Sequence, residues 1–192
     1  MFQRDISKSN VVICTIFYQD LAGLKRLVSS VNDVEFIFVD GRFIHWNGPI
    51  LSEDGSREFL QSKGFTIIDA PDLIEYQKRN KYIEKAQELG YEYCLVIDSD
   101  EYVINWDISD IINDDCYKHE QLHDSSSHFP YYRIHKSTAR HRTKHQECFI
   151  GNKQIFNQDV KTIKLVTHHD KTLRSEQRQE YRLKYYNENP IR

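Results

Sequence analysis

The first half of the chain repeats one pattern: a short apolar, β-branched run is followed by a segment whose apolar residues have helical spacing. Three such units in succession predict an α/β fold with a mainly parallel sheet flanked by helices, because each crossover returns the chain in the same strand direction. The expected strands are residues 11–17, 34–39, 65–68 and 93–97, and the expected helices are residues 20–31, capped by Asp20, 56–63 and 74–89. Ligands bind such sheets at the carboxyl ends of the strands.

Length and composition indicate one folded domain covering residues 1–192. Leu, Ile, Val and Phe account for 52 of the 192 residues, above the fraction at which disorder is expected. No apolar stretch is long enough to span a membrane, and the first ten residues lack the apolar region of a signal peptide. We therefore expect a cytoplasmic protein without a transmembrane segment. The four cysteines have no CxxC spacing, and Cys14 and Cys94 are expected to be buried apolar residues.

The second half is less regular. We expect a mobile polar connection at residues 113–128, a strand at 160–167 and a polar helix at 173–186. Residues 1–128 carry a net charge of −11 and residues 129–192 a net charge of +8, and eight of the nine histidines lie at or after His119. This asymmetry suits a metal or anionic ligand held between the two parts, or merely two oppositely charged surfaces that dock. The overall net charge of −3 argues against a general nucleic-acid binder.

The strongest motif is CLVIDSDEYV at residues 94–103, where a buried strand leads directly into Asp98 and Asp100. Two neighbouring carboxylates are costly to hold together unless a cation neutralises them, and their oxygens suit Mg²⁺ or Mn²⁺. The simpler interpretation is that both residues cap the following turn. An EF-hand is excluded, because Tyr102 and Val103 occupy positions at which the calcium loop needs Asp or Asn and then Gly.

Four elements, VVICTIF, FVDG, KRNKYIEKA and VIDSDEY, resemble the GT-A fold glycosyltransferases, especially family-2-like members. The resemblance implies a GT-A-like nucleotide-diphospho-sugar transferase fold, with a nucleotide-binding half at residues 1–104 and a short, irregular acceptor half at 105–192. It implies metal-dependent transfer of a sugar from a nucleoside-diphosphate sugar to an unknown glycan, protein or lipid acceptor. Compact GT-A-like proteins of crenarchaeal viruses are similar in size and general character, which would place the chain in a host cytoplasm.

The resemblance also implies residue roles. Asp40 would contact the nucleotide base, Arg79 the nucleotide or its phosphates, Asp98 the ribose or the metal, and Asp100 the metal, which is Mn²⁺ or Mg²⁺. A late histidine would complete the metal site; only one of His168 and His169 should reach the ion, and the resemblance favours His168. Further candidates are Thr15 and Phe17 at the end of the first strand, Arg174 and Arg178 for the diphosphate, and Glu147, Asp159 or Asp170 as catalytic base, with Glu147 favoured.

Three alternatives involve other chemistry. His119, Glu120 and His123 match HExxH, which on a helix holds zinc, with Glu147 available as a third ligand; surface residues are the more favoured interpretation of this match. Asp98 and Asp100 also resemble a haloacid-dehalogenase motif, but that family carries it on the first strand. A Rossmann dehydrogenase would need GxGxxG after the first strand. A non-catalytic sugar- or nucleotide-binding protein remains open.

Overall fold

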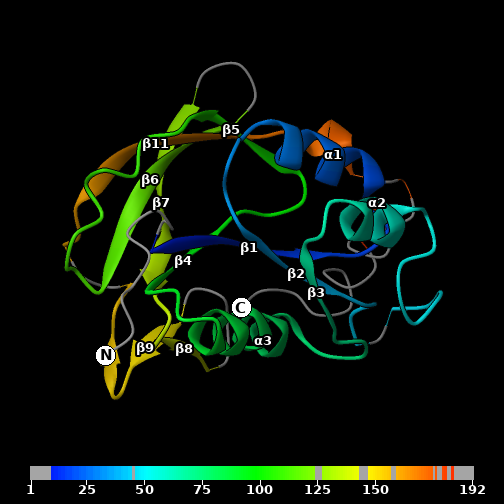
Figure 1. Ribbon diagram of the computed structural model, residues 1–192, viewed down its shortest axis with the longest axis horizontal. Coiled ribbons are helices and arrows are strands. Elements are labelled where there is room, and N and C mark those ends of the chain that lie inside the picture. The colour runs from blue at the N-terminus through cyan, green and yellow to red at the C-terminus, as the bar shows by residue number, and fades with distance from the viewer. Residues whose placement is uncertain are drawn as a thin grey trace.

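The computed structural model describes residues 10–44, 46–123, 127–142, 147–156, 159–174, 176, 179, 180 and 183, with only the backbone of 127–129. It confirms the expected mixed α/β class, with a mainly parallel central sheet flanked by helices (Figure 1). The helices are α1 (Leu21–Ser29), α2 (Ser56–Ser62) and α3 (Glu75–Glu88), and a 3₁₀ turn covers Lys171–Leu173. The strands are β1 (Val11–Phe17), β2 (Phe36–Asp40), β3 (Thr66–Asp69), β4 (Tyr93–Val96), β5 (Glu101–Asn105), β6 (Cys116–His123), β7 (Ser127–Lys136), β8 (Arg140–His141), β9 (Cys148–Ile150), β10 (Lys153–Gln154) and β11 (Thr162–His169).

The main sheet has the order β3-β2-β1-β4-β7-β6-β11-β5. Strands β3, β2, β1 and β4 are parallel, as the crossover pattern predicted. Strand β7 is antiparallel to β4 and β6, and β11 is parallel to β6 but antiparallel to β5. Because β2 and β4 lie on opposite sides of β1, the chain changes direction across the sheet at β1 and β4, where α/β sheets open a crevice for ligands.

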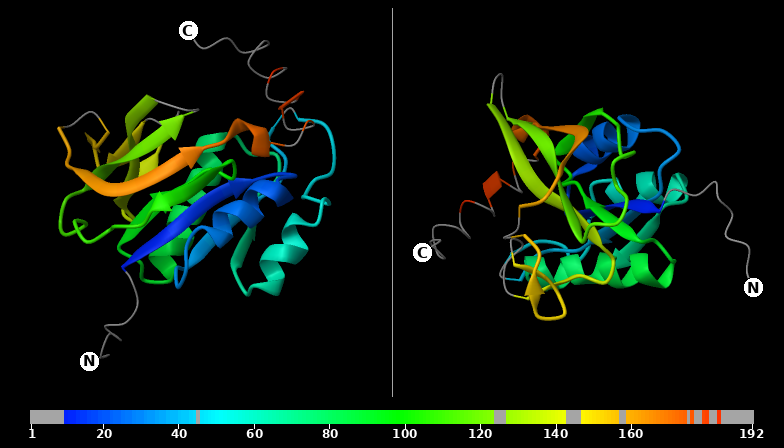
Figure 2. Two further views of the ribbon diagram at one scale, coloured as in Figure 1. Left: turned by 90° about the horizontal axis from the view of Figure 1, so that it is seen from above. Right: turned by 90° about the vertical axis from the view of Figure 1, so that its left-hand side faces the viewer.

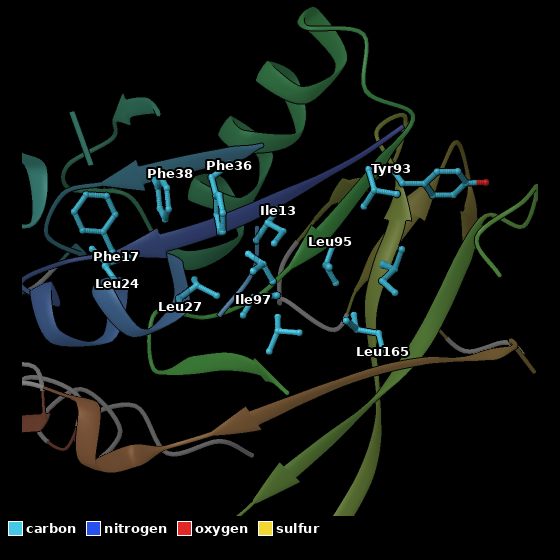
Figure 3. Close-up of a cluster of buried hydrophobic side chains, with 14 of the residues drawn as sticks. Ile13, Phe17, Leu24, Leu27, Phe36, Phe38, Tyr93, Leu95, Ile97 and Leu165 are labelled. Atoms are coloured by element: carbon cyan, nitrogen blue, oxygen red, sulfur yellow. The ribbon is translucent and has the colours of Figure 1, made fainter. Parts of the chain in front are cut away.

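The helices cover both faces of the parallel part of the sheet, with α1 and α2 on one face and α3 on the other (Figures 1 and 2). Side chains alternate along β1, so one face packs against Leu24 and Leu27 of α1 and Leu60 of α2. Figure 3 shows this cluster, which extends to Leu165 of β11. The opposite face of β1 packs against Tyr82 and Ile83 of α3. Burial on both faces explains why β1 is continuously apolar.

The predicted elements of the first half are all present, with ends that differ by a few residues. Asp20 does precede α1, but its carboxylate does not cap the helix. It accepts a hydrogen bond from the Ser99 hydroxyl (2.7 Å), while Asp54 accepts one from the backbone N–H of Leu21 (2.9 Å). Asp20 is therefore the N-cap residue of α1, as predicted, but its carboxylate ties the start of the helix to the loop after β4.

The prediction of a mobile polar connection at residues 113–128 was wrong, because half of this segment, Cys116–His123, is β6, which lies between β7 and β11 in the main sheet. Its buried face carries polar side chains, which an analysis of apolar periodicity does not recognise. His119 is buried against the Thr167 hydroxyl (2.9 Å), and the Gln121 amide donates to Glu101 (2.6 Å). Nε2 of His119 and the Gln121 amide therefore have partners inside the sheet, whereas Nδ1 of His119 is buried without one among the described residues.

The remaining expectations concern the C-terminal region. The strand expected at 160–167 is β11, which continues through His168 and His169. The helix expected at 173–186 and its residue Arg178 lie largely outside the described residues. All four cysteines are buried and free, as expected for Cys14 and Cys94. Within the described ranges, no helix has both the length and the apolar character needed to cross a membrane.

Candidate functional site

The Asp98–Asp100 loop directly follows β4 and lies at the carboxyl end of the parallel strands. Helix α1 packs tightly on this loop, since a Cβ atom added to Gly23 would lie 2.1 Å from the Ser99 carbonyl oxygen. The bond from the Ser99 hydroxyl to Asp20 holds the same loop from the side. The fold thus fixes the backbone that presents the two predicted carboxylates.

Asp98 lies between two arginines. One carboxylate oxygen accepts from Arg79 of α3 (3.4 Å), and the other accepts two bonds from Arg133 of β7 (3.0 Å each). Arg133 is an extra residue in β7, because Tyr117 and Lys118 of β6 pair with the residues on either side of it. Such β-bulges redirect a side chain. The Asp98 side chain remains 30% exposed, so part of it is open to a ligand.

Asp100 is only 2% exposed and meets groups from the end of the chain. Its Oδ2 lies 3.0 Å from Nε2 of His169 and also accepts a hydrogen bond from Nε of Arg174. Nη2 of Arg174 lies 2.8 Å from the same His169 nitrogen, which accepts this hydrogen bond in the tautomer that carries its proton on Nδ1. That proton faces Nδ1 of His123 (3.2 Å). Two acceptor atoms therefore converge on one cationic group.

Glu101 is buried next to these carboxylates, and its role was missed in the sequence. It accepts hydrogen bonds from the backbone of Asp98 (2.9 Å), from Gln121 (2.6 Å) and from Arg133 (3.2 Å). Burial raises the pKa of Glu101 to about 7, although the charge of Arg133 acts in the opposite direction. Glu101 thus links the Asp98 loop to Arg133 and β6 and titrates near neutral pH.

The structure brings together only some of the predicted nucleotide ligands. Asp40 ends β2, as expected, but it is fully buried and accepts hydrogen bonds from Ser52 (2.7 Å) and Arg57 (2.7 Å). Thr15 is fully buried, and Phe17 packs edge-on against Phe38 in the core. Strand β1 directs the Phe17 side chain inward, and the nucleotide or sugar contacts expected of Thr15 and Phe17 stay predictions.

The histidine expected to reach the metal differs from the one that the structure places there. His168 lies against the ring of Tyr102, with centroids 5.1 Å apart, whereas His169 contacts Asp100. That only one of the pair reaches an ion stays a prediction, and the contact with Asp100 favours His169 over His168 for this role. A bulge in β5 opposite Val166 and Thr167 shifts the pairing at this end of β11.

The three candidate bases lie on different elements. Asp170 follows β11; its backbone N–H donates to the Asp100 carbonyl (2.9 Å), and its carboxylate accepts from Thr172 (2.6 Å). Glu147 immediately precedes β9 in the small sheet, and Asp159 is exposed. Asp170 is thus the one of the three that the structure places against the Asp98–Asp100 loop.

Asp100 and His169 together fit a divalent cation. They offer a carboxylate oxygen and an unprotonated imidazole nitrogen, a donor pair suited to Mn²⁺, and both already accept hydrogen bonds from the Arg174 guanidinium. Asp98 does not join them in a group of three ligand atoms within 4.8 Å among the described residues. An ion on this pair would therefore complete its coordination with substrate oxygens or water.

The HExxH match has a different structural role from a zinc helix. His119, Glu120 and His123 lie on β6, and the strand geometry contradicts the helical placement that a metalloprotease requires. The favoured interpretation as surface residues was also wrong for His119, which is fully buried. Burial lowers the pKa of His119 to about 3, so its imidazole is neutral.

Other residues of the site gave little signal in the sequence. Glu101 belongs to the DSDE motif and could have been noted there, whereas Arg133, Gln121 and His123 lie in polar segments without a recognisable pattern. Their partners are between 20 and 46 residues away along the chain, so only the folded sheet brings them together.

No protein-family model matches the chain, and a search of curated proteins finds no match. Among solved structures, S. aureus TarS, a glycosyltransferase, is similar with a TM-score of 0.48 and 13% identity, over 67% of this chain and 28% of TarS. A structure of TarS 1–349 gives the same TM-score and identity, over 67% of this chain and 47% of that one. The chain thus spans less than half the length of either structure. Likeness at this level identifies neither a family nor a substrate.

Proposed function

We propose that the chain is a glycosyltransferase that moves a sugar from a nucleoside-diphosphate sugar to a hydroxyl-bearing glycan, protein or lipid acceptor. One observation carries the proposal: Asp100, at the carboxyl end of β4, meets His169 and Arg174, which lie 69 and 74 residues further along the chain. These groups gather beside the place where the strand order changes direction, the usual ligand crevice of an open α/β sheet.

The chemistry of the residues suits a diphosphate leaving group. When the sugar departs, the nucleoside diphosphate gains negative charge, which fixed cationic groups stabilise. Arg174 and Arg133 supply guanidinium groups at the site, held in place by Asp100 and Asp98. A Mn²⁺ or Mg²⁺ ion held by Asp100 and His169 would add Lewis-acid stabilisation of the same charge. Arg174 would then be available for the diphosphate oxygens.

The remaining residues fit supporting roles. Asp98, which is more exposed than Asp100 and Glu101, suits a ribose hydroxyl, and Arg79 and Arg133 fix its orientation. We assign the nucleotide to residues 1–104 and the acceptor to residues 105–192. An inverting transfer needs a base near the acceptor hydroxyl, and Asp170 is the candidate nearest the site, while Glu147 and Asp159 remain alternatives.

The test is release of nucleoside diphosphate from a panel of nucleotide sugars in the presence of Mn²⁺, with and without simple sugar acceptors. Turnover of at least one donor is expected, and Asp100→Asn should abolish it. Asp110→Asn is a matched control, because Asp110 pairs with Lys161 at the surface, away from the site, and should retain full activity. If the panel neither binds nor turns over, the proposal fails.

A second candidate is a binding protein without catalysis. Asp98 and Asp100 already pair with Arg133 and Arg174, so the acidic loop is largely neutralised by the chain itself, as in a purely structural ion-pair network. Saturable nucleotide-sugar binding with no product after prolonged incubation would favour this candidate over the enzyme.

A further inference from the structure

Three metal-ligating side chains meet in the interior at a distance from the carboxylate loop. His135 is the second-last residue of β7, His141 is the last residue of β8, and Cys148 is the first residue of β9. One ligand atom from each of the three side chains lies within 4.8 Å of the other two. All three residues are buried. Figure 1 shows β8 and β9 beside α3, on the face of the main sheet opposite α1 and α2. The cluster thus joins three strands that follow one another in the chain.

His135 presents a free lone pair. Its Nδ1 lies 3.1 Å from the carbonyl oxygen of Lys136, which can only accept a hydrogen bond, so the ring proton is on Nδ1. Its Nε2 is therefore an acceptor, and this atom is fully buried without a hydrogen-bond partner among the described residues. A buried acceptor left without a partner is costly. Metal-bound histidines usually have this arrangement, with the second nitrogen donating to a carbonyl.

The surroundings favour a metal over water or an ion pair. The rings of His135 and His141 lie 5.6 Å apart, and Phe156 packs against both, with centroids 6.2 and 6.1 Å away. Cys116, Ala139 and Ile155 belong to the same buried cluster as Cys148 and Phe156.

The backbone around the cluster is fixed from α3. Asn80 accepts a hydrogen bond from the backbone N–H of His141 (2.9 Å) and donates one to its carbonyl (2.9 Å). Its neighbour Arg79 is neutralised by Glu75 (2.7 Å) and Asp98 (3.4 Å), so this guanidinium does not present an uncompensated positive charge to an incoming cation. The backbone of His141 is therefore fixed by Asn80 before any ion binds.

We propose that His135, His141 and Cys148 bind a zinc ion that fastens the small sheet β8–β9–β10 to β7. Two imidazoles and one thiolate are typical zinc donors, and a fourth position would be filled by water or another donor. On binding, the Cys148 thiol releases its proton to solvent as its sulfur bonds to the ion. This site is separate from the donor site of the proposed function and does not depend on it.

The zinc site would also steady the carboxylate loop indirectly. Arg133, which holds Asp98, lies two residues before His135 on β7, and Arg79, which also contacts Asp98, precedes Asn80 on α3. A shift of the small sheet would therefore displace β7 and α3, and with them the two arginines that bind Asp98. We expect the zinc to act on stability and on the order of these strands, with no contact to substrate.

The test is elemental analysis of the full chain, purified with a reducing agent and without chelators, then dialysed. About one zinc per chain is expected in the wild type and in Cys14→Ser, a control in which another fully buried cysteine is changed. Cys148→Ser and His135→Gln should lose at least about tenfold in zinc affinity. Asp100→Asn should keep its zinc, which separates this site from the donor site.

Cobalt replacement gives a second measurement if a ligand variant fails to fold. Co²⁺ added to the zinc-free wild type should produce a thiolate-to-metal charge-transfer band and the intense visible bands of a tetrahedral site, and Cys14→Ser should reproduce both. The proposal is overturned if the wild type contains no zinc and shows no thiolate band with Co²⁺. It is equally overturned if folded Cys148→Ser keeps the zinc and the band.

Discussion

At the scale of single residues, the site is a set of buried charges that stabilise one another. Asp100 faces His169 and Arg174, and Asp98 faces Arg133, which also contacts Glu101. Removing one member of a buried pair leaves the other without compensation, which costs more than an exposed pair contributes. Substitutions here should therefore change both stability and ligand binding.

Glu101 predicts a specific dependence of stability on pH. Its pKa rises from an ordinary 4.5 to about 7 in the folded chain, so the folded state holds a proton that the unfolded state has lost between these values. The free energy of unfolding should therefore fall as pH rises from about 4.5 to about 7, by about 1 to 3 kcal/mol, because one pKa unit corresponds to about 1.4 kcal/mol.

Urea unfolding at pH 5 and pH 8 measures this effect. In Glu101→Gln, the free energy of unfolding should fall less between pH 5 and pH 8 than in the wild type. The exposed control Glu88→Gln should show the same fall as the wild type. If the free energy of unfolding changes equally with pH in the wild type and in Glu101→Gln, Glu101 does not hold an extra proton in the folded chain.

Arg174 predicts two opposite effects of one substitution. Its guanidinium bonds both Asp100 and His169, the pair proposed to hold Mn²⁺, so it competes with the ion. Arg174→Gln should raise Mn²⁺ affinity in the absence of nucleotide and lower nucleoside-diphosphate affinity by about tenfold, the effect of losing one charged hydrogen bond. Calorimetry of both ligands, with Arg142→Gln as an exposed control, tests this. A loss of affinity for both ligands would mean that Arg174 helps to form the metal site.

At the scale of elements, the first four strands and three helices follow from hydrophobic periodicity, because β1, β2 and β4 are buried on both faces and α1 presents an apolar stripe. The antiparallel region could not be predicted in this way. Strand β6 buries His119 and Gln121, whose partners Thr167 and Glu101 belong to other strands. Only the assembled sheet brings these buried polar side chains to their partners.

The contact between α1 and the carboxylate loop gives a prediction at this scale. Gly23 has no positive φ, and alanine is the better helix former by about 1 kcal/mol, so Gly23→Ala would stabilise an exposed helix. Here the new methyl group meets the Ser99 carbonyl, so we expect a net loss of about 1 to 3 kcal/mol and weaker nucleotide binding.

Thermal unfolding and nucleotide titration of Gly23→Ala measure these two effects. Lys25→Ala changes an exposed position of the same helix and should leave both unchanged. An unaltered or increased stability of Gly23→Ala would indicate that the loop does not lie against α1 as described.

At the scale of the whole molecule, the acidic and basic parts of the sequence form ion pairs with each other. The acidic first part meets the basic second part at Asp98 with Arg133 and at Asp100 with Arg174. The sequence left two interpretations open, a ligand site or simple docking, and the geometry contains elements of both. The docked pairs are present, and the acceptor atoms of Asp100 and His169 converge on a position suited to a cation.

The most direct measurement is an experimental structure of the chain with Mn²⁺ and a nucleoside diphosphate. We expect the ion at about 2.0 to 2.2 Å from an Asp100 oxygen and from His169 Nε2, with the diphosphate near Arg174 and the ribose near Asp98. A nucleotide bound away from the carboxyl end of β4, or an ion that contacts neither Asp100 nor His169, would show that this loop is not the donor site.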